Sequence, residues 1–171
     1  MDPEKMLKGR MAESLVEELL KKSKNQVYRF GYEAILQNLT QIEKCLERVG
    51  DTSDRIKALP DFIILDKNGT PTFLEVKFRW DGKVHKNDHH KLAKIEEFWN
   101  AKIIFVNSHR KPYFMISEPP YFDSEGNFTC KPLIEETEWK IDPKVYEEFE
   151  TLVEKYLVPK LLKDSAQDLV K

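Results

Sequence analysis

Apolar and polar residues alternate with a helical period in four segments of this 171-residue chain. The pattern predicts four amphipathic helices, at residues 9–22, 33–49, 88–100 and 143–158. Asn87 or Asp88 is a suitable N-cap for the third helix. Asp142 followed by Pro143 is typical of the start of the fourth, because proline fits the first helical position. Pro159 is expected to kink or stop that helix.

Short apolar runs between these helices predict five β-strands, at residues 27–30, 60–65, 72–78, 103–106 and 113–116. Residues 60–65 and 72–78 carry apolar side chains on both faces, which is typical of a sheet covered by helices on both sides. We therefore expect an α/β fold. Residues 51–54 are expected to form a loop, and residues 121–141 to hold turns and a loose hairpin.

Composition limits the classes of protein to which the chain can belong. With 40% hydrophobic and 34% charged residues, the chain is long enough for one folded domain with a sizeable core. It has no run of eighteen apolar residues, and its N-terminus lacks the apolar segment of a signal peptide. We therefore expect a cytoplasmic protein without a membrane span. Cys45 and Cys130 lie far apart and are expected to be reduced packing residues.

Charge is unevenly distributed along the chain, although the formal net charge is only −2. From Lys77 to Lys111 there are nine Lys and Arg against four acidic residues, and all four His lie there as well. From Asp123 to Glu154 there are ten acidic residues against three Lys. One face could thus receive a polyanion while another repels it. Two ordinary solvated surfaces explain this distribution equally well.

Two carboxylates and an amine belong to a predicted β-hairpin. Glu75 and Lys77 are two positions apart on its second strand, so they point to the same face. Asp61 opens the first strand, and the turn decides whether it joins them. A two-residue turn pairs position 61 with position 76 and places Asp61 on the other face. A three-residue Lys67-Asn-Gly69 loop pairs position 61 with position 75, and both turns fit the sequence.

The three-residue loop would gather Asp61, Glu75 and Lys77 in one polar cluster at the sheet edge. Two carboxylates a few Å apart repel, and ionising both costs on the order of 1–4 kcal/mol unless a cation lies between them. Oxygen ligands without cysteine favour Mg²⁺, for which Mn²⁺ can substitute. Such an ion would polarise a phosphoryl oxygen and help to generate hydroxide. In the alternative interpretation, Glu75 and Lys77 form a neutralising surface pair and Asp61 only begins a strand.

The first predicted helix can supply a further carboxylate to this cluster. At about 100° per residue, Glu13 borders the apolar face of the helix. Glu17 lies about 40° further out, and Glu18 faces away. Glu13 is therefore the better candidate to reach a site between the helix and the sheet, and Glu17 is the second. A border residue in plain solvent is the alternative for Glu13.

The spacing of these residues resembles a known motif. Pro60-Asp61, followed fourteen positions later by Glu75-Val-Lys77, resembles the PD-(D/E)xK motif of the restriction-endonuclease-like superfamily. In archaeal Holliday junction resolvases and their relatives, a Gly-x-x-x-Glu helix start is similar to Gly9-Arg-Met-Ala-Glu13. The span from Gly9 to Val106 looks most like those proteins.

The resemblance implies a restriction-endonuclease-like core with a central mixed sheet of about five strands flanked by helices. The core would span residues 1–118 and include an inserted helix at residues 33–49. Residues 119–171 would form a C-terminal loop and helical extension appended to the same domain.

The resemblance also implies roles for individual residues. Asp61 and Glu75 would hold Mg²⁺ together with the backbone carbonyl of Val76. Lys77 would orient or activate the attacking water, and Glu13 would complete the site directly or through water. Basic residues after the motif are expected to contact nucleic acid: Arg79, Lys83, Lys86, Lys91 and Lys94.

We accordingly expect a metal-dependent nuclease that hydrolyses phosphodiester bonds in DNA, an Mg²⁺-dependent endodeoxyribonuclease. The alternative is a catalytically silent module on the same fold that binds nucleic acid or protein. Aromatic residues on the last predicted helix favour a homodimer formed through it. An intramolecular cover for the core explains those residues equally well.

Overall fold

The computed structural model of this chain describes residues 3–31 and 51–159. The predicted helix over residues 33–49, Cys45 and the residues after Pro159 lie outside this part of the chain. The described elements are, in chain order, α1 (Pro3–Lys22), β1 (Gln26–Arg29), α4 (Asp51–Lys57), β2 (Phe62–Leu65), β3 (Pro71–Arg79), α5 (Lys86–Trp99), β4 (Lys102–Asn107), β5 (Phe114–Ser117), β6 (Lys131–Pro132), a 3₁₀ turn (Leu133–Glu135) and α6 (Pro143–Tyr156).

The strands form one open, mixed sheet in the order β1 to β6. Only β3 and β4 run parallel, and every other neighbouring pair is antiparallel. Parallel neighbours need a crossover connection, which α5 supplies here. The predicted α/β class is confirmed, and β6 adds a sixth strand to the five that the sequence predicts.

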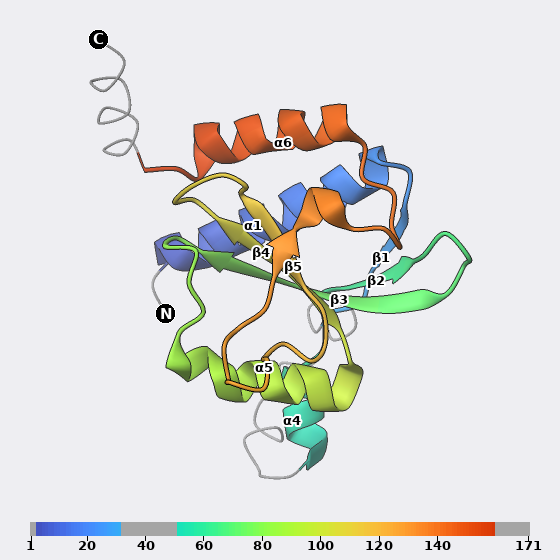
Figure 1. Ribbon diagram of the computed structural model, residues 1–171, viewed down its shortest axis with the longest axis vertical. Coiled ribbons are helices and arrows are strands. Elements are labelled where there is room, and N and C mark those ends of the chain that lie inside the picture. The colour runs from blue at the N-terminus through green and yellow to red at the C-terminus, as the bar shows by residue number, and fades with distance from the viewer. Residues whose placement is uncertain (1–2, 32–50, 160–171) are drawn as a thin grey trace.

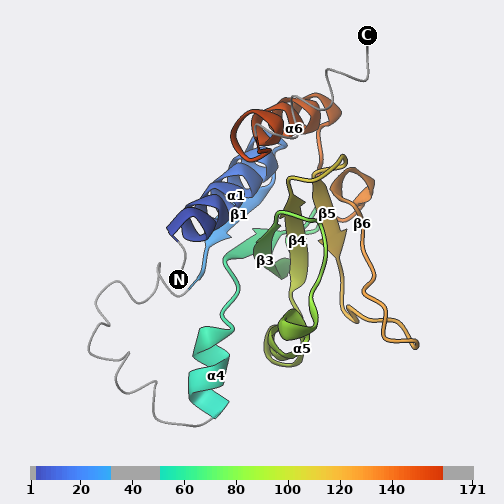
Figure 2. The same ribbon diagram turned by 90° about the vertical axis from the view of Figure 1, so that its left-hand side faces the viewer.

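Helices cover both faces of the sheet (Figures 1 and 2). On one face, α1 and α6 pack over a core that includes Val16, Leu74 and Phe149. On the other face, α5 packs Leu92 and Ile95 against the alternate residues of β4. Every residue of β4 is buried. The central strands are therefore apolar on both faces, as the sequence predicts.

Helix α6 begins as expected, because the Asp142 side chain accepts hydrogen bonds from the Lys144 and Val145 N–H groups and Pro143 occupies the first turn. Its residues Tyr146 and Phe149 are buried in the core of their own chain. Residues after 118 thus continue the same fold, since β6 pairs with β5 and α6 contacts α1.

Three predictions of local structure are wrong. The first helix begins at Pro3 and not at residue 9. Residues 51–54 belong to helix α4 and not to a loop, since contacts to α5 outweigh the weak helix preference of Asp, Thr and Ser. One of these contacts joins Asp54 to Lys94. Helix α5 is capped by His85 and not by Asn87 or Asp88. Asp88 lies three residues after the cap and accepts a hydrogen bond from the His85 N–H at 3.1 Å.

The predicted packing role of Cys130 is also wrong, because this free thiol is exposed. It directly precedes the two-residue strand β6. The hairpin expected before it is present, since Phe122 and Phe128 form an isolated bridge around the Asp123–Gly126 turn.

The turn between β2 and β3 is the three-residue form. Phe62 pairs with Leu74, a register that continues to Asp61 opposite Glu75. The Asp66 N–H donates to the Thr70 carbonyl at 2.9 Å, and Gly69 adopts φ +81°. The left-handed conformation explains the glycine, since a β-carbon is disfavoured there. The register needed for a cluster of Asp61, Glu75 and Lys77 is confirmed.

We predict that two Gly→Ala substitutions have opposite effects on stability. Gly69→Ala should lower the free energy of unfolding by about 1–2 kcal/mol, because alanine strains the left-handed turn. Gly9→Ala lies within α1, where an added β-carbon meets no atom within 4 Å. It should raise the free energy by about 0.5–1 kcal/mol. Urea unfolding of both variants measures this, and a Gly69→Ala variant as stable as the wild type would contradict the assigned turn.

Candidate active site

The candidate site lies where the sheet opens between β2 and β3. Strand β2 pairs with β3 only from Phe62 to Leu65. Beyond Leu74, β3 continues to Arg79 with β4 as its partner on the other side. Within the described residues, this half of β3 therefore has one edge without a neighbouring strand. Backbone groups on that edge are available to side chains and ligands.

Asp61 occupies this open edge. Its Oδ2 accepts a hydrogen bond from the Val76 N–H at 2.7 Å. The N–H and C=O of one strand residue point to the same side, so the Val76 carbonyl also faces the open edge. The Asp61 carbonyl accepts from the Phe30 and Gly31 N–H groups at 2.9 and 3.1 Å, so the segment directly after β1 fixes Asp61.

Gly31 was not predicted to contribute to the site. A β-carbon at this position would lie 3.4 Å from the Asp61 Cα, so glycine permits the close approach of the two backbones. A glycine directly after a predicted strand is the only local signal for this role.

Glu75 is the buried carboxylate of the cluster, with 7% of its surface exposed. Its Oε1 accepts a short hydrogen bond from the Lys77 ammonium. Its Oε2 is buried and has no hydrogen-bond partner among the described residues. An ionised oxygen left in this state is costly in a folded protein, so the position suits a ligand that binds carboxylate oxygen.

The pKa values follow from burial and from the crowding of charges. Burial, followed by the negative charges of Glu75 and Glu13, raises the pKa of Asp61 to about 8. Burial opposes the Lys77 ammonium, but the carboxylates of Glu75 and Asp61 outweigh it and raise the pKa of Lys77. Lys77 thus compensates the carboxyl groups of Asp61 and Glu75 only in part, because the pKa of Asp61 stays raised.

Glu13 and Glu17 differ in what surrounds them. Glu13 is near enough to Asp61 to contribute to its raised pKa, and it also interacts with Arg29. Glu17 is committed to ion pairs with Lys21 at 2.7 Å and Arg29 at 2.5 Å. Burial opposes ionisation of Glu17, but the hydrogen bonds from these two cations lower its pKa. The structure therefore brings Glu13, and not Glu17, towards the cluster.

The donor atoms of the cluster fit a hard divalent cation. Asp61 and Glu75 offer carboxylate oxygens, Val76 offers a carbonyl oxygen, and the unpartnered Glu75 Oε2 is already dehydrated. No group of three His, Cys, Asp or Glu residues that could hold a metal is found in the part of the chain that the structure describes. Two carboxylates and one carbonyl suit an ion such as Mg²⁺, which keeps several waters and needs one or two carboxylates.

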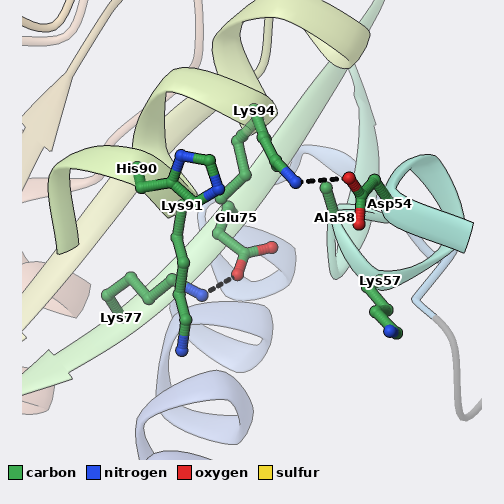
Figure 3. Close-up of a pocket in the computed structure, with 9 residues that line it drawn as sticks. Asp54, Lys57, Ala58, Glu75, Lys77, His90, Lys91 and Lys94 are labelled. Carbon is green, nitrogen blue, oxygen red and sulfur yellow. Dashed lines mark hydrogen bonds and ion pairs between the residues drawn. The ribbon is translucent and has the colours of Figure 1, made fainter. Parts of the chain in front are cut away.

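A pocket of about 430 Å³ adjoins Glu75 and Lys77 on the face of the sheet that α5 covers. Figure 3 shows that α5 and α4 form its two sides. The sequence does not point to Lys57 or Asp54, which line this pocket, because residues 51–54 are predicted to form a loop and no element is predicted for residues 55–59. Only a prediction that residues 51–57 form a helix would have placed these two side chains beside Glu75.

The five basic residues expected to contact nucleic acid fall into two groups. Arg79 pairs with Asp88 through two hydrogen bonds of 2.6 and 3.2 Å, and Lys94 pairs with Asp54 at 2.5 Å. The other three are exposed: Lys83, Lys86 and Lys91. Of the five, Lys91 and Lys94 line the pocket beside Glu75.

The acidic segment 123–154 is partly neutralised by the preceding basic segment. Buried Lys102 lies 3.3 Å from Glu136 and 2.7 Å from Glu138. Lys111 lies 3.0 Å from Glu154. Lys102 and Lys111 thus belong to intramolecular ion pairs, and the charge of the basic segment is not gathered on one free face.

No family model matches this sequence, and a search of curated proteins finds none similar to it. None of the described helices combines the length and the apolar character that a membrane span requires.

We predict that Asp61→Asn alters the pH dependence of stability in metal-free buffer. The pKa of Asp61 is about 8 in the fold and about 3.9 in an unfolded chain. The unfolded chain therefore releases this proton first, and stability falls as the pH rises from about 4 to 8. Asparagine removes that loss and can still accept from the Val76 N–H. At pH 8 the variant should be more stable by about 1–3 kcal/mol, and near pH 4 it should match the wild type.

Urea unfolding in EDTA across this pH range provides the measurement. Glu18→Gln is the matched control, because Glu18 is an exposed residue of the same α1 helix that carries Glu13. Its stability profile should parallel that of the wild type. Equal slopes for Asp61→Asn and wild type would show that Asp61 is not a crowded, partly desolvated carboxyl group.

Proposed function

We propose that this protein is an Mg²⁺-dependent nuclease with a restriction-endonuclease-like core, and that it hydrolyses phosphodiester bonds in DNA. The observation that carries the proposal is the gathering of Asp61, Glu75 and Lys77 at an open sheet edge, with one buried Glu75 oxygen left without a partner. A structural salt bridge would account for Glu75 and Lys77. It would not account for a second carboxyl group held against them.

The chain's own groups have distinct roles in this proposal. Asp61, Glu75 and the Val76 carbonyl would hold the ion, and Glu13 would contribute directly or through a water molecule. Bound there, Mg²⁺ would polarise the phosphoryl oxygen and lower the pKa of a bound water. The Val76 N–H fixes Asp61 for this task, so the oxygen donors are positioned before an ion arrives.

Lys77 is better suited to orient the water than to take its proton. Its pKa is raised by the neighbouring carboxylates, so it stays an ammonium group at neutral pH. An ammonium group donates hydrogen bonds and offsets negative charge that develops on the phosphoryl oxygens as water attacks phosphorus. Glu75 keeps the ammonium in place through its Oε1.

The sheet arrangement supports the same proposal. The motif strand β3 is central, its neighbour β4 is reached through α5, and α1 brings Glu13 from the opposite face of the sheet. A homodimer through α6 stays a prediction. The α6 residues Tyr146 and Phe149 serve the core of their own chain, whereas Tyr156 is 52% exposed.

We predict that purified protein cleaves DNA oligonucleotides in Mg²⁺ or Mn²⁺ and is inactive in EDTA. Asp61→Ala and Lys77→Ala should each lower the cleavage rate at least about 100-fold, a typical loss for a group that acts on the attacking water or holds its activator. Mn²⁺ binding, followed by calorimetry, should be lost in Asp61→Ala and retained in Lys77→Ala.

Lys144→Ala is the matched control, because Lys144 is exposed on α6, and it should cleave as the wild type does. Activity that persists in both site variants would place the chemistry elsewhere. Metal binding that depends on Asp61, without cleavage of any DNA, would instead support the alternative of a catalytically silent binding module.

A further inference from the structure

Two helices bound the pocket beside the proposed site. Helix α5 provides one side and helix α4 the other, with Glu75 and Lys77 between them (Figure 3). The Lys94 ammonium lies 2.5 Å from Asp54 and joins the two helices. The pocket is thus bounded on two sides.

Further contacts fix α4 in this position. The Trp99 indole N–H donates to the Arg55 carbonyl at 3.3 Å. The Arg55 guanidinium lies 5.2 Å from the centre of the Phe98 ring. Three contacts thus hold a seven-residue helix against α5, which gives the wall a defined place beside the carboxylates.

The charge of the pocket is positive and is concentrated on two lysines. Four Lys line it against two acidic residues, Asp54 and Glu75, and these six residues sum to a charge of +2. Two of the Lys are paired, Lys77 with Glu75 and Lys94 with Asp54. Lys57 and Lys91 are exposed and form no ion pair with any described residue. They come from opposite walls, so two phosphate groups could each meet one ammonium group.

The volume of the pocket limits what can enter. Its volume is about 430 Å³. It lies at the small end of the roughly 300–1,000 Å³ of pockets that take one small molecule. One nucleotide is of that class, and a base pair within a duplex is not.

We propose that this pocket receives one unpaired nucleotide of a DNA strand, with Lys57 and Lys91 holding the phosphates on its two sides. The proposal rests on the nuclease function proposed above and names its substrate class: single-stranded DNA or an unpaired tail, and not a fully paired duplex. An already unpaired nucleotide is favoured because extracting one from a duplex costs a few kcal/mol of stacking and pairing.

Binding in EDTA tests the pocket without cleavage. A fluorescent single strand should bind at least about tenfold more tightly than a covalently closed duplex of the same sequence, following the cost of unpairing. Lys57→Ala/Lys91→Ala should weaken single-strand binding by about tenfold or more. It should also reduce the slope of log affinity against log salt by about 1.4, as expected for two lost phosphate contacts on a single strand.

Lys140→Ala/Lys144→Ala is the matched control, since both lysines are exposed and far along the chain from the pocket. This variant should bind like the wild type. Equal affinity for the single strand and the closed duplex, or an unchanged salt slope in Lys57→Ala/Lys91→Ala, would overturn the pocket assignment.

Cleavage in Mg²⁺ separates this inference from the proposed function. Cuts confined to the unpaired tail of a tailed duplex, lost in Lys57→Ala/Lys91→Ala, support both. Selective single-strand binding without cleavage of any DNA supports the pocket and overturns the nuclease function. Cleavage of the closed duplex or a four-way junction as fast as the single strand supports the nuclease function and overturns the pocket assignment.

Discussion

The repulsion between carboxyl groups at the open edge of β3 is the constraint on which the rest of the site depends. The hairpin register, extended by one residue beyond Phe62, places Asp61 opposite Glu75, and Glu13 approaches from α1. The fold compensates this crowding in part, through the Lys77 ammonium, the Val76 N–H and the charge of Arg29. The compensation is incomplete, since the pKa of Asp61 rises to about 8 and the Glu75 Oε2 has no partner among the described residues. A cation would relieve both conditions together.

The crowding is maintained by parts of the fold that have no chemistry of their own. The left-handed Gly69 sets the hairpin register, and backbone hydrogen bonds from Phe30 and Gly31 hold Asp61. Strand β4 supports β3 through parallel pairing, so β3 can lose its other neighbour after Leu74 and still keep its position. The stability of the sheet therefore makes possible a local arrangement that is itself unfavourable.

Local signals in the sequence were sufficient where a single segment determines its own structure. The start of α6 at Asp142-Pro143 and the buried strand β4 follow from residue type and period alone. The β2–β3 turn was ambiguous because both turn forms suit the same residues. The choice is made by which strand residues reach the core, and the three-residue form buries Phe62 and Ile64.

Long-range contacts determine the elements that the sequence did not predict. Helix α4 is held by Lys94, Trp99 and Phe98 of α5, forty or more positions along the chain. Strand β6 has only two residues, and one is a proline, so no alternating pattern exists to reveal it. The site was therefore predictable in its motif residues, whereas the wall that α4 builds beside it was not.

The number of charged residues in the basic and acidic segments gives the charge of each segment, but it does not show where unpaired charge lies in the fold. Four basic residues of the segment already form ion pairs with carboxylates: Arg79, Lys94, Lys102 and Lys111. Their acidic partners lie in the basic segment itself, in α4 or in the acidic segment. An ammonium group already paired with a carboxylate has less to gain from a phosphate, because binding must first break the existing pair. The exposed Lys91 and the unpredicted Lys57 do not carry that cost. The basic charge that is not used in these pairs is consequently smaller than the count of the segment suggests, and Lys91 places part of it at the pocket between α4 and α5.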